Sequence, residues 1–86
     1  MLIRVVISGR NYDAAQAVPE FLELPDGCSL DDGLQRLARL VPPAQRLPDS
    51  CLVAVSGQHL GTLGRHRARQ LEDGDELVVI APVAGG

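Results

Sequence analysis

LEDGDELVVIAPVAGG, the sequence of residues 71–86, joins a tight-turn signal to an apolar run and to an ending that carries almost no side chains. Asp73-Gly74-Asp75 is typical of a tight turn, because glycine adopts positive φ angles without a steric cost. The run from Glu76 to Ala81 is rich in leucine, valine and isoleucine, which predicts a strand. This stretch therefore predicts a last strand that leads from a turn straight into a thin chain end, Ala84-Gly85-Gly86.

The composition of this chain end indicates a segment that another protein receives. Glycine has no Cβ, so its backbone can pass through a channel too narrow for side chains and deliver a terminal carboxylate to another protein's active site. A frayed terminus is the alternative, because small residues are common in disordered chain ends. We therefore predict a folded domain over residues 1–81 and a flexible C-terminal tail over residues 82–86.

Two strands are predicted before the middle of the chain. Leu2 to Ser8 is apolar and β-branched and is broken by Gly9, which predicts a central strand. Residues 21–24 predict a second strand that ends at the turn Pro25-Asp26-Gly27, so an antiparallel pair is expected. Between them, the polar segment Arg10 to Pro19 is expected to loop across one edge, with a short helical turn around residues 14–17.

One helix is predicted after this pair of strands. Ser29 is a favourable N-cap, and Asp32 three residues later completes a variant of the capping box. Apolar side chains then recur at helical spacing as far as Val41, and Pro42-Pro43 stops the helix. Gly33 costs this helix about 1 kcal/mol relative to alanine. Its presence indicates either close packing or tolerance on the solvent side.

The remaining sequence completes a sheet. Cys51 to Val55 predicts a third strand, Ser56-Gly57-Gln58 its turn, and residues 58–60 a short strand. With the final strand, the order is strand, strand, helix, strand, short strand, strand. This order predicts a two-layer α+β domain in which one main helix covers a sheet of four to five strands.

The overall composition excludes several classes of function. The chain has 86 residues, 45% of them hydrophobic, which is enough for one small domain. Only Tyr12 and Phe21 are aromatic and the net charge is −3, so nucleic acid is not an expected partner. There is no lysine to form a Schiff base or accept an isopeptide bond. The sequence shows neither a signal peptide nor an apolar run of membrane-spanning length, so we expect a soluble, cytoplasmic protein without a membrane partner.

No set of residues has the spacing of a catalytic or metal site. Cys28 and Cys51 are too far apart for a CxxC pair and have no activating neighbour in sequence, so we expect both to be small buried residues. His59 and His66 have no partner at metal-ligand spacing. The basic cluster over residues 65–69 is followed at once by acidic residues, which favours a solvated face over a docking patch.

Three features together resemble the MoaD/ThiS family of ubiquitin-like sulfur carriers: the order of elements, the turn over residues 71–77 and the ending from Pro82 to Gly86. The resemblance covers essentially the whole chain and implies a β-grasp fold with a mixed sheet. The chain length, the long loop at residues 10–19 and the proline before Val-Ala-Gly-Gly are more similar to the MoaD branch. The arginine cluster and the scarcity of aromatic residues depart from the pattern and leave the downstream partner open.

The resemblance also implies a chemistry for the tail. An ionised carboxylate is a poor acyl electrophile, so Gly86 needs activation. By resemblance, a ubiquitin-activating-type enzyme uses ATP and Mg²⁺ to adenylate Gly86, and a sulfur donor protein converts the product to a thiocarboxylate. Pro82, Val83, Ala84 and Gly85 would thread the tail into the protein that receives it.

The same resemblance implies a carrier rather than an enzyme, with no tightly bound cofactor and no metal. It is expected to serve a molybdopterin-synthase large subunit, as its small non-catalytic subunit, or a thiazole synthase. Two alternatives stay open: a protein modifier conjugated through Gly86, and a binding module that is never activated. Sequence features do not separate them.

Overall fold

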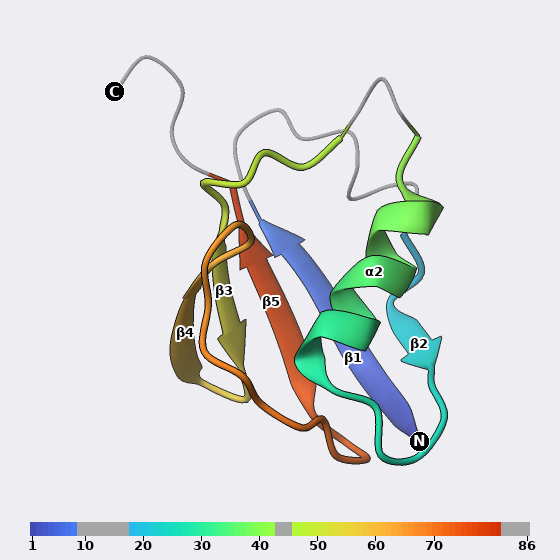
Figure 1. The fold of residues 1–86 in the computed structure, drawn as a ribbon. Helices are drawn as coiled ribbons and strands as arrows, with labels where there is room; N and C mark the ends of the chain where they lie inside the picture. Colours follow the sequence, from blue (N-terminus) through green and yellow to red (C-terminus); the bar gives the residue numbers. More distant parts are fainter. Residues whose placement is uncertain (9–17, 43–45, 82–86) are drawn as a thin grey trace.

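Strand β5 (Glu76–Ile80) lies at the centre of the sheet in the computed structural model, which describes residues 1–8, 18–42 and 46–81. Within these residues five strands form one sheet in the order β2-β1-β5-β3-β4, and one helix packs on it (Figure 1). This architecture confirms the predicted α+β class and is a β-grasp fold. The other elements are β1 (Leu2–Ser8), β2 (Phe21–Glu23), α2 (Leu30–Leu40), β3 (Leu52–Val55) and β4 (Gln58–Thr62).

The sheet is mixed because β1 and β5 run parallel while every other neighbouring pair is antiparallel. The predicted opening pair is confirmed, with Ile3 opposite Leu22. In the β3–β4 hairpin, Ser56 and Gly57 both have positive φ, which matches the right-handed twist of the two strands. The strand predicted near residues 58–60 is present and continues to Thr62.

Helix α2 begins as the sequence predicts. The hydroxyl of Ser29 accepts a hydrogen bond from the backbone N–H of Asp32, and the Asp32 carboxylate accepts one from the N–H of Ser29. Gly33 is buried, and a Cβ built on it would lie 2.9 Å from Cδ1 of Leu71. Close packing is therefore the reason for this glycine. The helical turn predicted around residues 14–17 lies outside the described residues.

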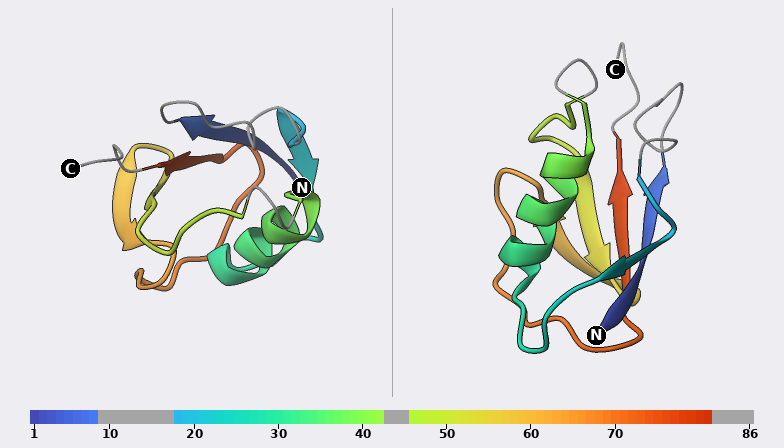
Figure 2. Two further views of the ribbon diagram at one scale, coloured as in Figure 1. Left: turned by 90° about the horizontal axis from the view of Figure 1, so that it is seen from above. Right: turned by 90° about the vertical axis from the view of Figure 1, so that its right-hand side faces the viewer.

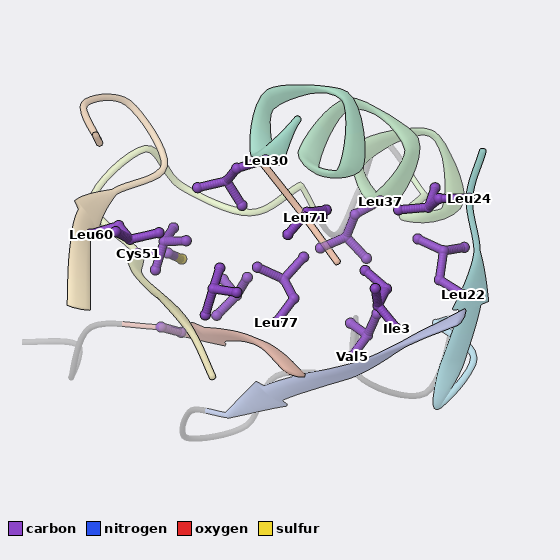
Figure 3. Close-up of a cluster of buried hydrophobic side chains, with 14 residues drawn as sticks. Ile3, Val5, Leu22, Leu24, Leu30, Leu37, Cys51, Leu60, Leu71 and Leu77 are labelled. Carbon is purple, nitrogen blue, oxygen red and sulfur yellow. The ribbon is translucent and has the colours of Figure 1, made fainter. Parts of the chain in front are cut away.

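The core fills the space between α2 and one face of the sheet (Figure 3). Alternate residues of β1, β5 and β3 point into it, as expected for strands with one face against a helix. The two views of Figure 2 place α2 on one side of the sheet only. The core residues are Ile3, Val5, Leu22, Leu24, Leu30, Leu37, Cys51, Val53, Val55, Leu60, Leu71, Leu77, Val79 and Ala81.

Candidate functional site

The point from which the tail leaves the domain is fixed by the two strands beside β5. Ile80 pairs with Ser8 of β1 on one side and with Leu52 of β3 on the other. The N–H of Ala81 then donates to the carbonyl oxygen of Ser8 at 2.7 Å. The predicted site residues Pro82, Val83, Ala84, Gly85 and Gly86 lie outside the described residues. The structure therefore places the base of the tail in the middle of the sheet.

The sheet face opposite α2 carries an apolar surface beside this base. Because Leu77, Val79 and Val53 point into the core, the residues between and beside them point to the other face. Among the described residues, no helix or strand covers this open face. The two rows nearest to the tail consist of Ser8, Ile80 and Leu52, and of Val6, Val78 and Ala54. We call these two rows the tail-side rows.

Farther from the tail, the open face becomes charged. Arg4 lies between Phe21 and Glu76 in the register of the sheet. Its guanidinium is 3.5 Å from a carboxylate oxygen of Glu20 and 3.7 Å from one of Glu76. All three charged side chains are at least 43% exposed, so each pair contributes less than about 1 kcal/mol to stability. The open face thus changes from apolar to charged with distance from the tail.

Sequence reasoning missed the tail-side rows, although a signal for them exists. A strand with one solvated face alternates apolar and polar residues, whereas residues 77–80 are apolar without a break. Such a run predicts cover on both faces. Leu52, at 46% exposed, continues the apolar surface onto β3. With the partly buried Val6, Val78 and Ile80 it forms a partly exposed apolar surface, and such surfaces are typical of interaction sites.

The other end of β5 is built from a buried polar network centred on Asp75, which is 7% exposed. Its Oδ1 accepts a hydrogen bond from the hydroxyl of Ser56 at 2.7 Å and lies 3.4 Å from Nη2 of Arg69. Its Oδ2 accepts the backbone N–H of Glu72 at 2.8 Å. Arg69 also donates to the carbonyl oxygen of Val55 at 2.9 Å. The carboxylate therefore closes the turn before β5 and ties it to the β3–β4 hairpin.

The basic cluster of residues 65–69 does not form a single solvated face. Arg65 and Arg67 are exposed, as expected, but Arg69 turns inward to Asp75 and His66 contacts α2. The prediction of a solvated face is wrong for these last two residues. Asp31, the partner of His66, is 35 positions away in the sequence. Asp75, the partner of Arg69, is six positions away, and the charge pattern did not show that these two side chains meet.

His66 connects the segment after β4 to the first turn of α2. Its Nδ1 is 2.9 Å from the carbonyl oxygen of Thr62 and its Nε2 is 2.6 Å from Oδ1 of Asp31. Burial lowers the pKa of His66, but the hydrogen bonds to Asp31 and Thr62 outweigh burial and raise the pKa above its ordinary value. Because both acceptors lack protons, a ring that carries two protons satisfies both contacts.

The two cysteines differ in their environments. Cys51 is fully buried in the core, and this burial raises the pKa of its thiol. This confirms the expected buried position for Cys51. Cys28 is only partly buried, and both thiols are free. A raised pKa disfavours the thiolate, the nucleophilic form, so Cys51 is unsuited to carry reactive sulfur.

In the part of the chain that the structure describes, no group of three or more histidine, cysteine, aspartate or glutamate side chains could hold a metal ion. Within the same residues, no helix has the length and apolar character needed to cross a membrane.

Comparisons with known proteins agree on one group of relatives. The sequence profile described as ThiS family matches residues 5–86, a range that includes β5 and the whole tail. A protein of Chlamydomonas reinhardtii named "Molybdopterin synthase sulfur carrier subunit" is 26% identical over 86 residues, which are the full length of both chains. No solved structure matches the chain significantly. The family match therefore includes residues 71–86, the turn, strand and chain end from which the tail was predicted.

Proposed function

Because the chain belongs to the ThiS family of sulfur carriers, which are not enzymes, we propose that it carries sulfur as a thiocarboxylate at Gly86 for molybdopterin synthesis. The observation that supports this most is the path of β5. The strand begins after the turn that Asp75 closes and ends at the tail-side rows, and in the sequence it is followed by residues 82–86, which end in Ala84-Gly85-Gly86. The full-length similarity to a molybdopterin synthase sulfur carrier subunit favours molybdopterin over thiamine as the product served.

The proposed chemistry takes place in two steps, the first at the α-phosphorus of ATP and the second at the terminal carbonyl carbon. A carboxylate oxygen of Gly86 attacks the α-phosphorus of ATP in an activating enzyme that holds Mg²⁺, and pyrophosphate leaves. A sulfide equivalent from a sulfur donor protein then displaces AMP, which departs with one of the original carboxylate oxygens. The terminus has exchanged one oxygen for sulfur. The sulfur is now a nucleophile, because the thiocarboxylate carries the negative charge.

The domain contributes reach and docking to this chemistry. Each extended residue adds at most about 3.3–3.6 Å, so the tail can carry Gly86 well into a pocket while the folded domain stays outside. Any protein that takes the tail close to its base lies against the tail-side rows, where Leu52 of β3 lies beside Ile80 of β5. The proposed occupants are the activating enzyme and, after sulfur transfer, a molybdopterin-synthase large subunit.

Intact-protein mass spectrometry tests the proposal. The chain is incubated with ATP, Mg²⁺, the activating enzyme and a sulfur source. We expect a mass gain of one oxygen-to-sulfur exchange, absent when ATP is omitted or Gly86 is deleted. Attachment to larger proteins would instead indicate a protein modifier, and no ATP-dependent change would contradict activation altogether.

A second incubation tests the product served. The thiocarboxylated chain is offered in parallel to a molybdopterin-synthase large subunit and to a thiazole synthase. We expect sulfur to be consumed only with the large subunit. Consumption only with thiazole synthase would contradict the molybdopterin assignment while leaving the carrier role intact.

A further inference from the structure

A groove on the α2 side of the molecule has no part in the chemistry of the tail. One wall is α2, and the other is formed by residues 46–49 and by the segment that follows β4, which runs on the same side of the sheet as α2 (Figure 2). The groove has a volume of about 640 Å³. It is separated from the open face by the sheet itself, so it lies on the opposite layer of the domain from the tail-side rows.

The floor of this groove is apolar and reaches the surface. Leu34, Leu47 and Leu63 line it, and all three are only partly buried while they pack against the core. Ala38 of α2 is exposed at the same place. Covering an apolar floor of this kind with side chains of another molecule is favourable, because it removes apolar surface from water.

The second wall is fixed by contacts that do not depend on a ligand. The N–H of Leu63 donates to the carbonyl oxygen of Cys51, and the N–H of Gly64 donates to that of Asp49. A Cβ on Gly64 would lie 2.9 Å from Cβ of Asp49, so the two segments are packed without spare room. At the end of the groove, His66 is bonded to Asp31 across the two walls. The groove is therefore preformed, which lowers the entropic cost of binding.

The charges around the groove favour an anionic group. Three cationic side chains line it, Arg39, Arg46 and His66, against the two carboxylates Asp31 and Asp49. Asp31 is already bonded to His66. Arg39 lies in the last turn of α2, is exposed, and has no ion pair among the described residues. A carboxylate next to an apolar side chain would therefore find a cation beside the floor.

We propose that this groove docks a segment of a partner protein that carries leucine-like side chains next to a carboxylate. The groove is open to solvent rather than enclosed, which suits a chain segment more than a buried small molecule. Because the groove and the tail-side rows lie on opposite layers, this partner binds while another protein holds the tail. The arrangement gives the carrier two docking surfaces. The surface beside the tail is apolar, whereas the groove on the helix side has an apolar floor bordered by arginine.

Nuclear magnetic resonance of the full chain tests the proposal with a defined probe, the blocked peptide acetyl-Glu-Leu-Leu-Asp-Leu-amide. We expect backbone amide shifts at Leu34, Leu47 and Leu63. Arg39→Glu is expected to weaken binding about fivefold to tenfold, because it replaces an attractive charge with a repulsive one. Arg36→Glu is the matched control: it lies on the same helix and changes charge equally, but it does not line the groove. It should retain at least half of the affinity.

Three outcomes would overturn the proposal. The first is the absence of groove shifts at millimolar peptide. The second is equal binding of the charge-swapped peptide acetyl-Lys-Leu-Leu-Lys-Leu-amide. The third is a change in the chemical shifts of the groove amides when Val83→Asp is introduced and no peptide is present. This result would make the chain's own tail the occupant of the groove. Adenylation of Gly86 by the activating enzyme, measured on Arg39→Glu, is expected to be unchanged and so separates this surface from the tail's function.

Discussion

The two ends of strand β5 lie in different chemical surroundings, although the strand is only five residues long. At its start, Asp75 is buried and accepts side-chain and backbone hydrogen bonds from Ser56 and Glu72, with Arg69 close by. At its end, Ile80 and Ala81 are held by pairing with β1 and β3 and are surrounded by apolar side chains. We call the first the fastened end, because its hydrogen bonds anchor the strand to the rest of the fold. We call the second the presenting end, because residues 82–86 follow it in the sequence. The difference teaches that stability and delivery are assigned to separate ends of the same strand.

The largest expected effect comes from deleting Gly86 at the presenting end. ATP–pyrophosphate exchange with the activating enzyme should fall to background, because the carboxylate that we propose to be adenylated is then one residue short of its position. The melting temperature should stay close to that of the parent, since the change lies beyond the last strand. A large fall in melting temperature would break the separation between the two ends.

The next effect belongs to the fastened end. Asp75→Ala leaves the hydroxyl of Ser56 and the N–H of Glu72 without this acceptor and removes the carboxylate beside the guanidinium of Arg69. We expect the free energy of unfolding to fall by about 2–4 kcal/mol in urea titrations. Asp73→Ala is the matched control: its exposed carboxylate accepts one hydrogen bond, from the N–H of Leu2, and it should cost about 0.5–1 kcal/mol. Equal losses would show that burial of Asp75 adds nothing.

A smaller effect is expected from Leu52→Asp in the tail-side rows. The activating enzyme should adenylate this variant about tenfold less efficiently, because a charge is placed on the apolar surface against which we propose that the enzyme docks. Phe21→Asp is the control that tests whether the place of the side chain on the open face matters, and not only its exposure. Phe21 is 51% exposed on the same face but lies in the charged row with Arg4. It should leave adenylation nearly unchanged. If both variants lose equally, docking does not concentrate beside the tail.

The smallest effect concerns His66, on the segment that leads into the fastened end. Its pKa is raised in the folded protein, so its contribution to stability is full below the unfolded value of 6.5 and is lost as pH rises through the folded value. The free energy of unfolding should therefore fall above about pH 6.5, by less than about 1 kcal/mol. His66→Gln should remove this slope, and His59→Gln, at an exposed position, should keep it. A slope that survives in His66→Gln would assign it to another group.

Local signals were sufficient for the elements whose causes are local. The capping box of Ser29 and Asp32, the breaks at glycine and proline, and the apolar runs of β1 and β5 each act within a few residues, so the sequence predicted those elements and the α+β class. The tail was also predicted from composition alone, and its residues lie outside the described part of the chain.

Long-range contacts were not predictable in the same way. The sequence left open whether Gly33 is packed or solvated, and only the approach of Leu71, 38 positions away, decides that it is packed. The inward turn of His66 depends on Asp31, 35 positions away on α2, and that of Arg69 depends on the turn that buries Asp75, six positions away.

By itself, the sequence determined that this protein is a small α+β domain ending in a glycine tail, because turn, cap and strand signals depend on neighbouring residues. Only the tertiary structure decided that β5 would lie at the centre of the sheet, with its fastened end buried and its presenting end, Ile80, beside the exposed Leu52. The physical reason is that the alternation of residues along a strand fixes the face to which each side chain points. The pairing of strands that are distant in sequence then fixes which residues lie beside that side chain.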